Sequence, residues 1–385
     1  MLSWKSGSTE RMSNGMSNII NYLTWRGDIP LAWVPFNVAD NLALSLLAYI
    51  LFENVMSKDD KLTVRQAAIE LRERSNDFGV MKSDNKRLLR ELSSGARFGD
   101  AMICHCVNEI DANEEKQFAA ITIYLDDGTC FIAYRGTDNT LIGWKEDFNL
   151  SFISPVPAQA ASVRYLRDVA EQTTGAIRIG GHSKGGNLAI YAASQCDHAI
   201  QDRIIAVYSN DGPGLDDSTF MSEGYARIKD RFFSFVPQSS IIGMLLQHQE
   251  NYTVVNSHAI GLFQHHPYTW QVNRAGFEIV DAIRPESRYV DTTLKNWLSS
   301  VSVDKRMVFV DTLYTVLSAT NATTLQGLTL RWWKNAYVML TSIKNIDSQT
   351  RKLIISVLVE LVKAAVRSRT SISPQVFLSD GTSPQ

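Results

Sequence analysis

The segment Gly181-His182-Ser183-Lys184-Gly185 constrains the fold of this 385-residue chain more than any other. It follows a short apolar run, 176–179, and precedes a helical pattern over 186–194. Glycines two positions before and after a serine let a strand and a helix approach closely and hold the serine on a tight, exposed turn. Ser183 is therefore a candidate nucleophile, and Gly181 and Gly185 are structural residues around it.

The segments on either side of this turn alternate between strand and helix patterns. Three short, partly alternating runs come first, and Asp126-Asp127-Gly128 is a hairpin signal between the last two. They are 102–110, 118–125 and 129–134. Helices are then expected at 160–172 and 186–194, and strands at 176–179, 204–208 and 232–236. This order predicts an α/β fold, a mostly parallel sheet flanked by helices, with a β-meander at its start.

Helical patterns dominate both ends of the chain. A chain of 385 residues is long enough for one large domain with an appendage. The expected helices are 40–54, 63–75 and 85–93 before the sheet, and 305–319, 329–343 and 348–367 after it. We expect a flexible N-terminus (1–17), an α/β domain (18–290), a helical C-terminal extension (291–369) and a flexible tail (370–385).

The net charge of −2 argues against a nucleic-acid partner. Residues 291–385 carry 11 Lys plus Arg and 6 Asp plus Glu, a net of +5, so this C-terminal part of the chain is basic and the part before it is acidic. The basic helix at 348–367 either docks on that acidic part or lies on an anionic membrane, and its small and β-branched apolar face favours docking. Four cysteines without metal-ligand spacing predict a cytoplasmic protein with no metal and no cofactor.

A serine nucleophile needs a base and an orienting acid, in the chain order Ser, Asp or Glu, His. His265 is the first candidate for the base because Gln264-His265-His266-Pro267 falls in a loop after the last strand pattern. His258 and His266 remain alternatives. Asp211 is the candidate acid at the end of the strand 204–208, although Asn210-Asp211-Gly212 would also suit an ordinary turn.

Two groups are candidates for an oxyanion hole. The backbone N–H of Lys184 lies at the start of the helix after Ser183, and Thr137 follows the strand 129–134 with its own N–H and hydroxyl. Arg135 and Asp147 are expected to be structural residues that pair with each other and fix the loop near Thr137. The side chain of Lys184 would suit an anionic substrate group or point into solvent, and solvent is favoured.

These motifs carry a family resemblance. Three motifs resemble, in their order along the chain, those of the class-three lipases. They are Tyr134-Arg135-Gly136-Thr137, then Trp144 with Asp147, then the turn at 181–186. The bacterial Mbeg-like family of α/β-hydrolases is a closer match. The segments that resemble it are 35–37, 209–214, 237–243 and 264–270, so the resemblance covers roughly 19–275. It implies an α/β-hydrolase fold with Ser183 as nucleophile, and no particular substrate.

One departure from the lipases affects the acid. Class-three lipases carry it beside a proline after the strand that corresponds to 232–236, where this chain has Val236-Pro237-Gln238 and no carboxylate. Asp211, one strand earlier, is then the natural substitute.

The leading hypothesis is a lipase-like serine hydrolase that cleaves a small-molecule carboxylic ester, such as a lipid or lysophospholipid, through an acyl-enzyme. Thioesterase or acyltransferase chemistry would use the same groups. A catalytically silent binding protein with this fold is the alternative from another class.

Overall fold

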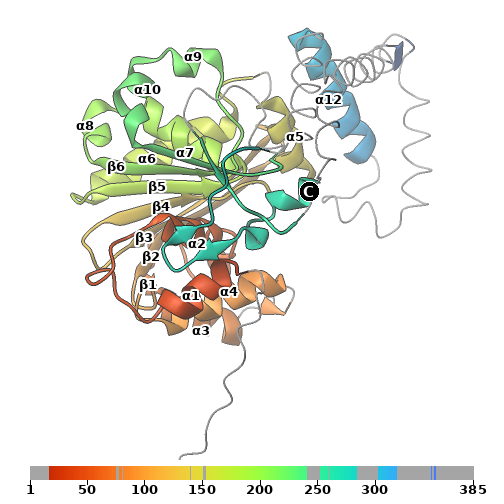
Figure 1. Cartoon of the computed structure of the whole chain (residues 1–385). Coiled ribbons are helices and arrows are strands. Elements are labelled where there is room, and N and C mark those ends of the chain that lie inside the picture. The colour runs from red at the N-terminus through yellow and green to blue at the C-terminus, as the bar shows by residue number, and fades with distance from the viewer. Residues whose placement is uncertain are drawn as a thin grey trace, which may run out of the picture.

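The chain forms an eight-stranded sheet with helices on both faces in a computed structural model (Figure 1). The structure describes residues 17–74, 78–79, 81–138, 140–150, 153–240, 252–259, 261–283, 302–318, 348 and 351–352. The expected helix at 329–343, nearly all of the helix at 348–367, residues 1–16 and the tail at 370–385 lie outside these residues.

The first half of the sheet is antiparallel. Its strands are β1 (Leu62–Thr63), β2 (Met102–Asp111), β3 (Lys116–Tyr124) and β4 (Cys130–Tyr134), each paired with the next. In the turn between β3 and β4, Gly128 has a φ of 78°, a left-handed conformation that glycine adopts at little cost. This explains why the Asp-Asp-Gly sequence marks the turn.

The second half of the sheet is parallel and runs from β4 to β8. Its further strands are β5 (Ile177–His182), β6 (Ile204–Asn210), β7 (Phe232–Pro237) and β8 (Tyr252–Val255). The carboxyl ends of these strands meet at one edge of the sheet, so residues that directly follow β4, β5 and β6 are brought together there. The mostly parallel α/β sheet is confirmed, whereas β8 was not expected.

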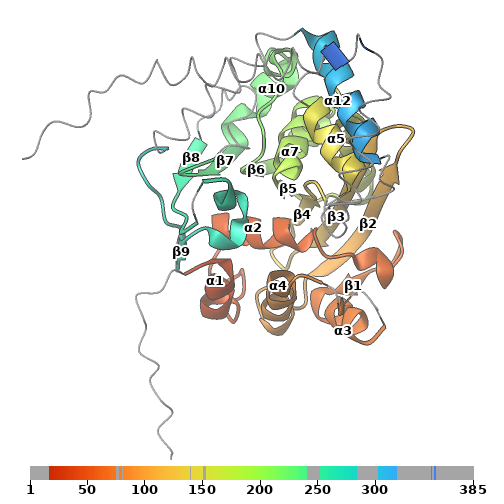
Figure 2. The same cartoon turned by 90° about the vertical axis from the view of Figure 1, so that its right-hand side faces the viewer.

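Two apolar cores lie on opposite faces of the sheet. Alternate residues of β4 divide between them, since Phe131 belongs to one core and Ile132 to the other. Helices α1 (Ile19–Arg26), α2 (Val38–Leu47), α3 (Val64–Arg74) and α4 (Ser83–Ser94) lie on the first face, and α6 (Pro157–Gln172), α7 (Lys184–Gln195) and α10 (Glu223–Ile228) on the second (Figures 1 and 2). Further short helices are α8 (His198–Gln201) and α9 (Asp217–Phe220).

Helix α2 is buried on nearly every side and packs against β4 and β5. The expected helix at 40–54 is shorter here, because α2 ends at Leu47 and a separate 3-10 turn covers Phe52–Asn54. Asn37 caps α2 by accepting the N–H groups of Ala39 and Asp40. The cap fixes where the helix begins, and therefore where its last turn meets the edge of the sheet.

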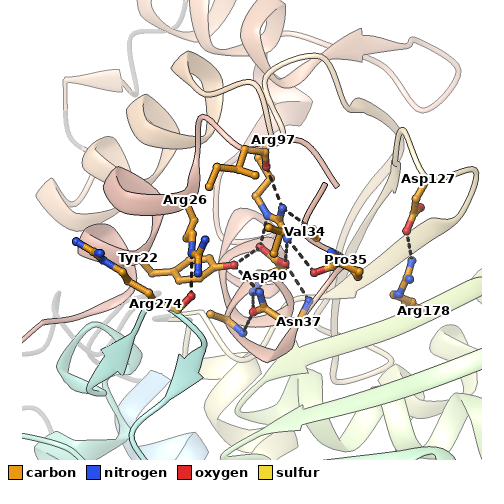
Figure 3. A network of polar contacts seen from close by, with 12 residues as sticks. Tyr22, Arg26, Val34, Pro35, Asn37, Asp40, Arg97, Asp127, Arg178 and Arg274 are labelled. Carbon is orange, nitrogen blue, oxygen red and sulfur yellow. Dashed lines mark hydrogen bonds and ion pairs between the residues drawn. The ribbon is translucent and has the colours of Figure 1, made fainter. Parts of the chain in front are cut away.

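A buried ion pair anchors α2 to the rest of the first face (Figure 3). Arg97 donates two hydrogen bonds to Asp40, and its remaining N–H groups donate to the carbonyls of Ile29, Val34 and Pro35. Tyr22 of α1 donates to the same carboxylate. Because each of these buried charged groups has several partners, the network holds α1, α2 and the loop between them in one arrangement.

Candidate active site

Ser183 lies on a sharp turn between β5 and α7, with a φ of 58° and a ψ of −134°. This is an uncommon conformation for a residue with a side chain, and the close packing around the turn maintains it. A Cβ at Gly181 would collide with the backbone of Gly185, and one at Gly185 with the carbonyl oxygen of Tyr134. The glycines of the motif are therefore required by contact between β4, β5 and α7.

Three side chains from distant parts of the chain form a hydrogen-bonded series at this edge of the sheet. The Nε2 atom of His265 lies 3.0 Å from the Oγ atom of Ser183, and its Nδ1 atom lies 2.6 Å from Oδ2 of Asp211. A carboxylate can only accept, so Nδ1 carries the proton and Nε2 is left to accept from the serine hydroxyl. The ring stands in position to remove the hydroxyl proton.

The carboxylate of Asp211 is fully buried, at a φ of 52°, directly after β6. Its second oxygen, Oδ1, accepts a hydrogen bond of 2.5 Å from the hydroxyl of Ser240. Ser240 follows β7 and was not predicted as a site residue. Its only sequence signal was its place in the 237–243 segment, just after the position where lipases carry their acid.

The two alternative histidines are placed elsewhere. The ring of His266 faces Asp84, with Nε2 4.0 Å from Oδ2, and His258 is exposed. Among the described residues, His265 supplies the ring that contacts the hydroxyl of Ser183.

His182 was not predicted as a site residue either. It supports the ring of His265. The two ring centres lie 4.7 Å apart, and Nε2 of His182 donates to the carbonyl oxygen of His265 over 2.9 Å. Its Nδ1 accepts from the hydroxyl of Tyr49, at 3.1 Å. Burial lowers the pKa of His182 well below the usual range. A neutral ring with both nitrogens engaged holds the His265 backbone in place.

Thr137 lies at the same edge of the sheet, after β4, and its hydroxyl donates to the carboxylate of Asp147 over 2.5 Å. The expected pair of Arg135 and Asp147 is wrong. Arg135 instead donates to Asn108 over 2.7 Å and lies 3.6 Å from Asp138. The reason is geometric: Asp147 faces the hydroxyl two residues after Arg135.

Both expectations for the side chain of Lys184 are also wrong. The ammonium reaches neither solvent nor the cavity, because the side chain is buried and lies 2.7 Å from Oε2 of Glu146. It also donates to the backbone and side-chain oxygens of Gln117, each over 2.8 Å. The backbone N–H of Lys184 still lies at the first turn of α7, beside Ser183.

A cavity of about 320 Å³ opens at Ser183. Helix α2 and the residues just after it supply an apolar and an aromatic residue to its wall, and the start of α4 supplies polar residues. The loop of His265 supplies others, and the rest come from the segments at the ends of β4 and β5. The lining residues are Leu46, Tyr49, Lys82, Asn85, Thr137, His182, Ser183, Phe263, His265, His266, Pro267 and Tyr268.

Burial raises the pKa of Asp147 to about 6, against the opposing effects of the Lys184 ammonium and the Thr137 hydroxyl. A carboxyl with a raised pKa stabilises the fold fully below its ordinary pKa and loses that contribution as pH rises through 6. Asp147→Asn removes this titration. Between pH 4 and pH 7 we therefore expect the free energy of unfolding of the wild type to fall relative to the variant by about 1 to 2 kcal/mol. Urea denaturation at both pH values measures the difference, and a pH-independent gap between the two proteins would contradict it.

The described part of the chain contains no cluster of three or more potential metal ligands. Within the same residues, no helix has the length and hydropathy needed to cross a bilayer.

Residues 92–315 match the family model described as Mbeg1-like. No curated protein matches the chain in sequence. Among solved structures, it is similar to a Rhizomucor miehei lipase in a propeptide complex, with 18% identity and a TM-score of 0.33, covering 48% of this chain and 63% of that one. It is also similar to M37 lipase, with 16% identity and a TM-score of 0.36, covering 54% and 68% respectively. The chain thus spans less than two thirds of the Rhizomucor protein.

Proposed function

Because this chain belongs to the Mbeg1-like family and holds a serine, an imidazole and a carboxylate in one hydrogen-bonded series, we propose that it is a serine hydrolase that cleaves carboxylic esters. The observation that carries the proposal is the ring of His265, which bridges Ser183 and Asp211. A buried acid, an oriented imidazole and a hydroxyl on a tight turn are the parts that make serine nucleophilic at neutral pH.

In the proposed reaction, Oγ of Ser183 attacks the ester carbonyl while Nε2 of His265 accepts the hydroxyl proton. Asp211 stabilises the imidazolium that forms. The backbone N–H groups of Lys184 and Thr137 are the proposed donors to the oxyanion. His265 then protonates the leaving alcohol, and water releases the acyl group by the same steps in reverse. Lipid and lysophospholipid esters fall within the proposed class, and thioesters would be attacked by the same groups.

A serine-directed fluorophosphonate tests the proposal. We expect a stoichiometric adduct located on Ser183 by mass spectrometry and absent from the folded Ser183→Ala protein. Hydrolysis of p-nitrophenyl butyrate and of a butyryl thioester by the wild type would then separate esterase from thioesterase activity. A folded wild type that neither reacts with the probe nor hydrolyses either ester would indicate a binding protein instead.

Ser240→Ala removes a hydrogen-bond donor from the acid of the proposed triad. We expect kcat to fall about tenfold, because Asp211 loses one of the contacts that fix its carboxylate. Ser240→Thr keeps a hydroxyl and should retain most of the activity. The matched control is Ser239→Ala, since Ser239 is also buried but contacts the histidine loop through its backbone N–H. Equal losses in Ser239→Ala and Ser240→Ala would mean that the effect is general packing.

A further inference from the structure

Helix α5 (Leu141–Asn149) carries three consecutive charged side chains that contact three different parts of the protein. They are Lys145, Glu146 and Asp147. Successive side chains on an α-helix point about 100° apart, so such a triplet connects several neighbours at once. Helix α5 was not predicted from the sequence, and neither were its partners.

Glu146 connects α5 to the turn that carries the nucleophile. Its Oε2 atom lies 2.7 Å from the ammonium of Lys184 and also accepts the N–H of Gln117. Its Oε1 atom accepts the N–H of Ala158. The carboxylate is fully buried, so α5 cannot shift relative to Lys184 without leaving a buried charge with fewer partners.

Asp147 connects α5 to Thr137. The hydroxyl of Thr137 donates to this carboxylate, and its oxygen lies 2.5 Å from each carboxylate oxygen, which fixes the loop after β4 at the cavity. The two proposed oxyanion donors are therefore held by adjacent residues of the same helix.

Lys145 points the other way, toward helix α12 (Val303–Ser318). Its ammonium lies 2.7 Å from Oδ1 of Asp311 and 2.5 Å from Oε1 of Glu115, and it stands 4.9 Å from the ring centre of Tyr314. Figures 1 and 2 show α12 beside α5. Although Lys145 is almost fully buried, the side chain of Asp311 is 58% exposed.

We propose that α12 positions the oxyanion donors through α5, with Asp311 as the positioning residue. The inference rests on the proposed hydrolase function. Losing Asp311 leaves the buried ammonium of Lys145 with Glu115 as its remaining carboxylate partner, so the placement of α5 becomes less well defined. Oxyanion donors act through their placement, so a small displacement lowers kcat more than it changes substrate binding.

The kinetic test compares Asp311→Asn with two other variants. For p-nitrophenyl butyrate we expect Asp311→Asn to lower kcat about tenfold with KM within about twofold of the wild type. Asp311→Glu keeps the charge and should recover most of the loss. Asp304→Asn is the control, because Asp304 is an exposed aspartate on the same helix and should leave kcat unchanged. An Asp311→Asn protein with the kcat of the control would overturn the proposal.

Hydrogen exchange gives a readout that does not depend on hydrolysis. We expect amides in residues 141–149 to exchange faster in Asp311→Asn than in Asp304→Asn, because α5 has lost a fixed contact. Unchanged exchange there would overturn the coupling whatever the kinetics show. If the wild type hydrolyses no ester and resists fluorophosphonate, the proposed function fails, while the exchange comparison still decides whether α12 holds α5.

Discussion

Replacing His265 by alanine is expected to lower kcat for p-nitrophenyl butyrate by about 10⁴-fold or more, with the protein still folded. The Nε2 atom of His265 is 3.0 Å from the hydroxyl of Ser183, and without it no described group stands ready to take the proton. The side chain is 27% exposed and lies at the cavity, so its loss opens little space in either apolar core. Steady-state kinetics, together with thermal unfolding of the same preparations, measures both effects.

The two alternative candidates for the base, His258 and His266, provide the comparison. His258→Ala should match the wild type, because this side chain is exposed and is not part of the cavity. His266→Ala should change KM more than kcat, because His266 lines the cavity without reaching Ser183. If His258→Ala or His266→Ala loses activity as completely as His265→Ala, the assignment of the base is wrong.

The sequence predicted the three proposed reacting side chains but not the residues that support them. Ser183 could be predicted because the signal for its turn is local. The glycines and the change from a strand pattern to a helix pattern lie within a few residues of it. Asp211 and His265 could be proposed because chain order and turn chemistry restrict the choice. The structure brings the three side chains within hydrogen-bond distance of one another.

The supporting residues could not be predicted in the same way, because each depends on a partner far along the chain. Lys184 was expected to point into solvent, because nothing near it in the sequence indicates that its ammonium contacts Glu146. His182 and Ser240 have no distinctive spacing of their own, and their contacts with His265 and Asp211 arise from tertiary packing. Sequence patterns therefore predicted the proposed reacting groups better than the residues that orient them.

Breaking the buried pair of Lys184 and Glu146 is expected to produce the largest loss of stability. Both side chains are almost completely removed from water. Lys184→Met would leave the carboxylate of Glu146 buried with only backbone N–H donors, at a cost of about 3 to 5 kcal/mol in the free energy of unfolding. Chemical denaturation of the two proteins at the same pH measures the difference.

Two further variants separate the charge from the packing. Lys58→Met removes one partner of an exposed pair with Asp168 and should cost less than about 1 kcal/mol, because solvent screens that pair. The double variant Lys184→Met/Glu146→Gln removes both charges and leaves one amide oxygen to accept a backbone N–H. It should therefore recover a large part of the loss, since no unpaired charge remains buried. A Lys184→Met protein as stable as Lys58→Met would show that water reaches Glu146, and that the pair does not hold α5 against the turn of Ser183.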